Sequence, residues 1–194
     1  MKGSPVTTET STLDTRSWLK RYYFVRAGVG ALWAAAAFTV GPQSAAVAAV
    51  LLVGYPAWDA VANYIDASRT GGLARNRTQA LNLVVSVVTT VAVLVALQVS
   101  EQWVLGVFGA WAVLAGLLQL ATAVRRWRTQ GAQWAMALSG GQSAVVGALF
   151  VSQAQSPAAS AIGTAAGYAA LGAFYFLVSA VWLTVTHRRG ADRG

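Results

Sequence analysis

The chain has 194 residues, of which 56% are hydrophobic and only 10% carry a charge. Soluble domains carry roughly 25% charged residues, so this composition is typical of a protein embedded in lipid. The net charge of +8 does not indicate nucleic-acid binding, because the basic residues flank apolar segments and do not gather on one solvated face. With no Cys in the chain, disulfides and thiolate metal sites are excluded.

Residues 1–17 are polar, rich in Ser and Thr, and show no periodicity, so we expect a disordered lead. Residues 18–186 form the predicted membrane domain, and residues 187–194 form a tail. The domain contains six apolar segments, at 22–40, 44–66, 80–99, 102–124, 132–154 and 157–185. Each is close to the ~20 residues that an α-helix needs to cross the hydrocarbon layer. The sequence therefore predicts an all-α polytopic membrane protein with six transmembrane helices.

The basic residues alternate between the connections of these segments. All 14 lie in the lead, the second and fourth connections, the tail or the first turns of the first segment: Lys2, Arg16, Lys20, Arg21, Arg26, Arg69, Arg75, Arg77, Arg125, Arg126, Arg128, Arg188, Arg189 and Arg193. Short loops rich in Lys and Arg stay in the cytoplasm. We therefore expect both termini inside, with anionic lipid headgroups and the bilayer itself as the partners of this face.

The other three connections are very short, and each can join only two neighbouring antiparallel helices. The segments thus form three hairpins, at about 22–66, 80–124 and 132–185. The hairpins resemble one another: the sequence from Gly30 to Trp33 recurs as Gly147 to Phe150, and Pro42 has a counterpart in Pro157. In the even segments Gly54-Tyr55 recurs as Gly167-Tyr168, with Gly109-Ala110-Trp111 between them. These spacings predict a threefold hairpin repeat.

Small residues predict how the helices pack, because helices in lipid associate by close backbone approach. The predicted stripes are Ala27, Ala31 and Ala35 in the first segment, Ser139, Ser143 and Gly147 in the fifth, and Gly163 with Gly167 in the sixth. Packing within one chain is the leading interpretation, and a homo-oligomer contact is the alternative. Trp33 and Trp111 lie deep in their segments, where we expect them to fill core or lipid-facing volume.

Two ionisable residues lie within the apolar segments, where charges are expensive and usually paired. Counting back from the first outer turn, Arg26 and Asp59 both lie about 22–27 Å from it at ~1.5 Å per residue. They share a depth on adjacent helices, which predicts a structural salt bridge. Snorkelling of Arg26 alone to the interface and a functional proton or ion site are the alternatives.

A few polar side chains continue this pattern. Asn63 extends the polar face of the second segment, while Thr89, Thr90 and Gln142 are the deepest polar residues and either bond across helices or line a path. Hydroxyl groups can also satisfy themselves on backbone carbonyls. No spacing of His, Asp and Glu suits a metal, and the lone His187 is far from any membrane-embedded Ser. We therefore expect no enzyme activity, no catalytic residues and no cofactor.

The stretch from Gly106 to Leu120, followed by Ala123-Val124-Arg125-Arg126, resembles the even helices of HdeD-like proteins. These are small bacterial inner-membrane proteins with six spans, built from a short two-helix repeat of unknown function. The resemblance covers about residues 19–186. It implies a bacterial cytoplasmic membrane location and a role in acid or other stress resistance, and it supplies no catalytic residues.

The leading hypothesis is a non-enzymatic membrane protein of the HdeD-like kind in acid or general stress tolerance. A small transporter or channel is the first alternative, because interrupted helices mark transporters and Pro56 could interrupt the second segment. An assembly subunit of a larger membrane complex is the second.

Overall fold

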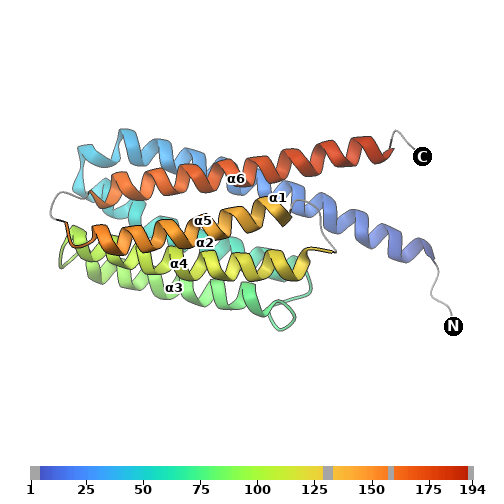
Figure 1. The fold of residues 1–194 in the computed structure, drawn as a ribbon, viewed down its shortest axis with the longest axis horizontal. Coiled ribbons are helices and arrows are strands. Elements are labelled where there is room, and N and C mark those ends of the chain that lie inside the picture. Colours follow the sequence, from blue (N-terminus) through green and yellow to red (C-terminus); the bar gives the residue numbers. More distant parts are fainter. Residues whose placement is uncertain (1–4, 129–132, 157–159, 192–194) are drawn as a thin grey trace.

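The computed structural model describes residues 5–128, 133–156 and 160–191. Within these ranges the secondary structure is entirely helical (Figure 1). The elements are α1 (Pro5–Thr39), the 3₁₀ turn η1 (Gly41–Gln43), α2 (Ala45–Arg69), α3 (Arg77–Ala96), α4 (Glu101–Arg126), α5 (Gln133–Gln153) and α6 (Ala161–Ala191). All six α-helices are long and apolar enough to cross a membrane. The predicted fold class is confirmed, and each predicted segment overlaps one helix.

The helices run antiparallel in chain order, so the bundle has two chemically different ends (Figure 1). At the first, which we call the basic end, α2 ends at Arg69, α4 ends at Arg126, and both termini of the chain project. At the second, which we call the short-loop end, the connections are brief. Ser44 and Ser100 cap the helices there, each accepting a bond from a backbone N–H three residues on.

The first helix extends into the N-terminal lead. We expected residues 1–17 to be disordered; residues 1–4 lie outside the described residues, and from Pro5 onward the structure has α1, which continues into the apolar segment without a break. Proline suits the first position of a helix, because its missing N–H has no partner there in any case. Once the apolar part of α1 is helical, extending it backwards adds one hydrogen bond for each residue fixed.

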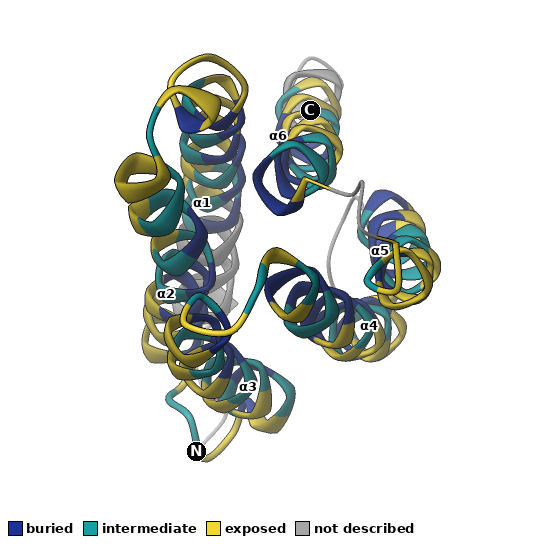
Figure 2. Cartoon of the chain, turned by 90° about the vertical axis from the view of Figure 1, so that its left-hand side faces the viewer, coloured by how far each residue is buried: buried dark blue, intermediate teal, exposed yellow. Residues whose placement is uncertain are grey.

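The six helices form a ring in which the closest packing joins different hairpins (Figure 2). α4 packs most extensively against α5, and α1 packs along α6 and so closes the ring. α2 lies against α3, and α3 lies against α4, whereas α1 and α2 touch much less despite their short connection. A short loop therefore sets the order and direction of two helices but not how tightly they pack.

The α4–α5 contact rests on two pairs of facing glycines. A Cβ built on Gly109 would lie 2.7 Å from the carbonyl oxygen of Gly147, and one built on Gly116 would lie 2.6 Å from that of Gly140. The reverse additions at Gly140 and Gly147 clash in the same way, at 2.7 and 2.6 Å. The two pairs are seven residues apart on each helix, so the backbones touch twice along one seam. No larger residue fits at these positions without moving a helix.

On α1 the buried stripe is not the predicted one. Ala27 is buried as expected, but Ala31 and Ala35 are exposed. Gly30, Ala34 and Ala37 are buried in their place, and a Cβ on Gly30 would lie 3.2 Å from the Cβ of Ala173 on α6. A step of four residues turns about 40° too far on a helix of 3.6 residues per turn, so a strict i, i+4, i+8 stripe leaves the buried face.

The predicted stripe on α6 also departs from the packing seam. Gly163 and Gly167 are half-buried, and a Cβ on Gly167 would meet nothing within 4 Å. Alanines fill the buried face here, with Ala165, Ala166 and Ala169 fully enclosed. On α5, by contrast, Ser139, Ser143 and Gly147 are all buried, as the sequence predicts.

Many large hydrophobic side chains are exposed on the surface of the bundle. Exposed aliphatic side chains include Leu32, Val50, Val95, Val124 and Val145. In water such a surface would drive aggregation, whereas lipid tails cover it at no cost. The fold is therefore that of a multi-pass membrane protein.

Candidate functional site

The polar interior of the bundle is organised around Asp59 on α2. Pro56 does not interrupt this helix: it is fully buried, and α2 runs unbroken from Ala45 to Arg69. Asp59, Asn63 and Asp66 follow it at helical spacing on the same buried face. This face points into the ring, so the second helix carries two carboxylates into an otherwise apolar bundle.

Asp59 and Arg26 form an ion pair between α2 and α1. The Nη2 atom of Arg26 donates to Oδ1 of Asp59 at 2.6 Å, and the two side chains are only 15% and 9% exposed. The guanidinium carbon of Arg26 also lies 4.5 Å from the ring centroid of Phe176 on α6, a cation–π contact. The structure thus brings together the two charges that the sequence places at one depth. The pair bridges two helices that otherwise touch little.

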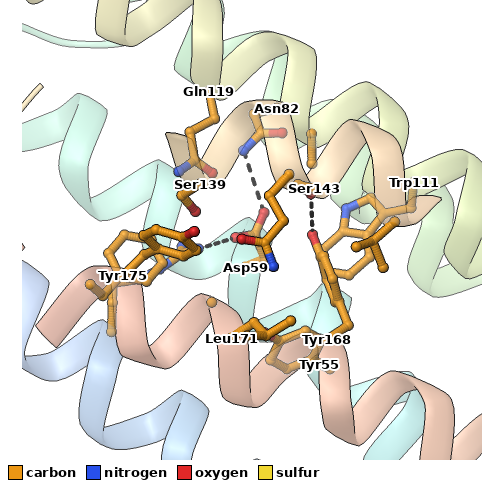
Figure 3. Close-up of a pocket in the computed structure, with 16 residues that line it drawn as sticks. Tyr55, Asp59, Asn82, Trp111, Gln119, Ser139, Ser143, Tyr168, Leu171 and Tyr175 are labelled. Carbon is orange, nitrogen blue, oxygen red and sulfur yellow. Dashed lines mark hydrogen bonds and ion pairs between the residues drawn. The ribbon is translucent and has the colours of Figure 1, made fainter. Parts of the chain in front are cut away.

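The second oxygen of Asp59 accepts hydrogen bonds from α2 and α3, and Figure 3 shows the one from Asn82. Oδ2 accepts from Asn63 Nδ2 at 2.9 Å, from Ser86 Oγ at 2.8 Å and, more weakly, from Asn82 Nδ2 at 3.5 Å. Ser86 in turn accepts from the indole Nε1 of Trp111 on α4 at 3.1 Å. One carboxylate therefore links four helices through bonds that a charged acceptor strengthens.

A second polar cluster lies closer to the basic end. Asp66 accepts from Arg126 Nη2 at 3.5 Å and from Gln79 Nε2 at 3.3 Å, through the same Oδ2 atom. Gln79 Oε1 accepts from Arg125 Nη2 at 3.1 Å, and Thr78 donates to the same oxygen at 3.0 Å. The cluster ties the last turn of α4 to the first turn of α3 and to α2.

Two small cavities adjoin these clusters. One, of about 60 Å³, lies beside Asp59 and is lined by Ser139, Ser143, Tyr168 and Tyr175 among others (Figure 3). The other, of about 50 Å³, lies beside Asp66. The residues that line both are Arg26, Asn82, Gln119 and Phe176. The cavities are thus neighbours along the bundle axis, and the Arg26 side chain lies between them.

Aromatic side chains form a layer on the short-loop side of the Asp59 cavity. Trp33 stacks on Tyr55 with ring centroids 4.4 Å apart, Tyr55 meets the edge of Trp111 at 5.6 Å, Trp111 meets Tyr168 at 6.2 Å, and Tyr168 meets Phe150 at 6.0 Å. These five residues, which we call the aromatic layer, come from α1, α2, α4, α6 and α5. They are the aromatic residues of the motifs compared between the hairpins, and the structure brings them into one layer.

The four residues predicted as polar lining occupy different positions in the structure. Asn63 joins the Asp59 cluster, and Gln142 lines the adjoining cavity. Thr89 and Thr90 each donate to a carbonyl of their own helix, at 2.8 Å in both cases. Ser143, predicted only as a small packing residue, donates to the carbonyl of Ala112 and shares a hydrogen bond with Tyr168.

Sequence reasoning missed Asn82, Ser86 and Gln79, which bind the two carboxylates. A signal was present: Gln79, Asn82, Ser86 and Thr89 recur every three or four residues along α3, a polar stripe within an apolar helix. Pro157, proposed as the counterpart of Pro42, lies outside the described residues. Among the residues that the structure describes, no three His, Asp or Glu side chains are grouped so that they could hold a metal ion.

A larger hollow is of a different kind. It measures about 750 Å³ and lies near the short-loop end between α2, α3 and the first turns of α4 and α6. Its lining is mostly aliphatic, as at Leu52, Val53 and Leu94, with Gln98, Ser100 and Glu101 as its polar residues. The polar centre around Asp59 is therefore the candidate functional site.

Fold and site together define a six-helix membrane bundle with an ion-paired polar interior. In a comparison with protein families, residues 83–152 match the model of a short repeat of unknown function (DUF308). The matched stretch contains most of α3, the whole of α4 and nearly all of α5, and thus both glycine pairs of the α4–α5 seam. No curated protein and no solved structure matches the chain.

Proposed function

We propose that the chain is a non-enzymatic protein of the bacterial inner membrane, of the HdeD-like kind, that acts in acid or general stress tolerance. Both termini are cytoplasmic in this proposal, because the basic end carries the Arg-rich connections. The repeat match at residues 83–152 supports the kinship. Anionic headgroups would meet the basic end, as they do other juxtamembrane basic clusters.

The observation that carries the proposal is the buried Arg26–Asp59 pair. Charges within a membrane are costly and tend to be kept for function. Apolar side chains of similar volume in place of the pair would make the fold about as stable, because a buried ion pair adds little net free energy of folding. In this proposal the pair is retained because the function requires a charged centre within the membrane.

The role is tested in a strain that lacks the gene. We expect survival after acid shock to fall in the deletion strain and to return when the wild-type chain is expressed from a plasmid. An osmotic or heat challenge of the same strains separates acid tolerance from general stress tolerance. Unchanged survival of the deletion strain under all three challenges would refute the proposed role.

One observation favours a second candidate, a small transporter or channel. The polar clusters and cavities occupy the interior over the half of the bundle next to the basic end, and transporters place polar sites near the middle of the bilayer. Purified protein in liposomes that enclose a pH-sensitive dye distinguishes the candidates. A proton flux above that of empty liposomes would favour the transporter.

A further inference from the structure

The cavity beside Asp66 contains polar atoms that the protein does not satisfy. Among the described residues, Asp66 Oδ1 and Asn82 Oδ1 are buried and have no hydrogen-bond partner, and both residues line this cavity. A buried acceptor without a donor costs free energy. Buried waters typically satisfy such groups where the space admits at least one, and about 50 Å³ of space exceeds the roughly 10–15 Å³ that one water requires.

The cavity beside Asp59 also has polar groups in its wall, and it lies next to the Asp66 cavity on the side toward the middle of the bundle. Ser139, Gln142 and Tyr175 contribute polar groups to its wall, and Arg26 and Asn82 border both cavities. The Asp66 cluster lies within the last turn of α2, while Asp59 lies about 15 Å from the end of that helix at ~1.5 Å per residue. The two cavities therefore lead from the basic end to the centre of the bundle.

Beyond Asp59 the interior changes. The aromatic layer crosses the bundle, and the core on its far side is built of apolar residues such as Leu105, Phe108 and Ile162. The hollow on that side has Leu52 and Val104 in its lining, and its polar lining residues are Gln98, Ser100 and Glu101 near the short-loop end. The aromatic layer and the largely apolar core lie between these residues and Asp59.

We propose that the two cavities form one water-filled access path, open to water and protons at the basic end and closed by the aromatic layer. Asp59 lies at the inner end of this path, and its charge is reached from one face of the membrane only. The inference does not depend on the acid-tolerance role, because it concerns which face of the membrane the centre communicates with. The charges along the path are paired, Arg26 with Asp59 and Arg126 with Asp66, so neither sign of charge dominates it.

The absence of Cys in the chain allows a direct test with single cysteines. Ser139→Cys places a thiol of nearly the same size in the wall of the Asp59 cavity, and Ala165→Cys places one in the buried core beyond the aromatic layer. The probe is Ag⁺, a soft cation that binds thiolate sulfur and does not cross lipid. Arg75→Cys, in the exposed connection between α2 and α3, reports which face of the vesicle carries the basic end.

Ag⁺ is applied to sealed vesicles from one face at a time, and the remaining free thiol is then counted with a maleimide after solubilisation. We expect Ag⁺ on the face of the basic end to protect Ser139→Cys severalfold against the maleimide, and Ag⁺ on the other face to leave it unprotected. Ala165→Cys should stay unprotected from both faces. Gln142→Cys, also in the wall of the Asp59 cavity, serves the same purpose if Ser139→Cys does not yield folded protein.

Protection from neither face at both cavity positions would show that the interior is dry and would overturn the proposal. Equal protection from both faces would show an open pore and would overturn the closure by the aromatic layer. Protection of Ala165→Cys as strong as that of Ser139→Cys would mean that the bundle opens to water on both sides of the aromatic layer, and would likewise refute the path.

Discussion

Removing one charge of the Arg26–Asp59 pair should cost more stability than removing both. Asp59→Asn keeps an oxygen acceptor for Ser86 and Asn63 but leaves Arg26 buried without its counter-charge. Breaking a buried pair in this way destabilises proteins by about 3–5 kcal/mol. Arg26→Met leaves the carboxylate with its neutral donors only, and we expect a loss near the lower end of that range.

The double variant Arg26→Met with Asp59→Asn contains no unpaired charge. Met fills the volume of the Arg stem beside Phe176, and the amide oxygen retains the neutral donors. If the two losses were additive, the double variant would be destabilised by about 6–8 kcal/mol. We expect it to be no less stable than either single variant, because apolar or neutral replacements of a buried pair are often tolerated.

The assay is equilibrium unfolding of the purified protein in mixed detergent and SDS micelles, followed by loss of helicity, for the wild type and the three variants. Strict additivity of the two single losses would refute the reasoning, because it would mean that the charges do not interact. Single variants as stable as the wild type would refute it as well, since Arg26 would then reach the interface without its partner.

Two further predictions concern helix packing. Gly140→Ala should destabilise the bundle by about 1–3 kcal/mol, because its Cβ would meet the backbone of Gly116. Gly141→Ala has open space around it and should be neutral or slightly stabilising. Equilibrium unfolding of the two variants checks this, and equal effects would disprove the glycine seam. The double variant Gly30→Cys with Ala173→Cys should form a disulfide on mild oxidation, because a Cβ at position 30 would lie 3.2 Å from the Cβ of Ala173. This distance is near the ~3.5–4.5 Å found in disulfides. A mobility shift on non-reducing gels reports the disulfide, and its absence would argue against closure of the ring by α1 and α6.

The membrane spans could be predicted from the sequence because one physical requirement, about 20 apolar residues per crossing, determines them. The proximity of Arg26 and Asp59 could be predicted for a related reason. Two adjacent antiparallel helices joined by a short turn place residues equally far from that turn at one depth, and the rise per residue is constant.

Packing partners could not be predicted in the same way. Loop lengths report which helices follow one another, but the tightest contacts join α4 to α5 and α1 to α6. Small residues occur on several faces of each helix, and the sequence does not state which face meets lipid. Ala31 and Gly30 are neighbours and both small, yet only Gly30 is buried.

The polar network was only partly visible in the sequence for a similar reason. A charge within an apolar segment is conspicuous, whereas Ser86 and Asn82 are ordinary residues until their distance to Asp59 is known. Their partner lies on another helix, 27 and 23 residues away in the chain. Only the three-dimensional ring brings these side chains to one carboxylate.

The central claim, that the charged centre carries the function, is tested most directly by the double variant Arg26→Met with Asp59→Asn. The measurement is acid-shock survival of the deletion strain expressing this variant, at a level of folded protein equal to that of the wild type. Our account predicts survival as low as that of the deletion strain, because the fold remains and the charges are gone. Survival equal to that of the wild type would contradict it and would leave the ion pair with a structural role alone.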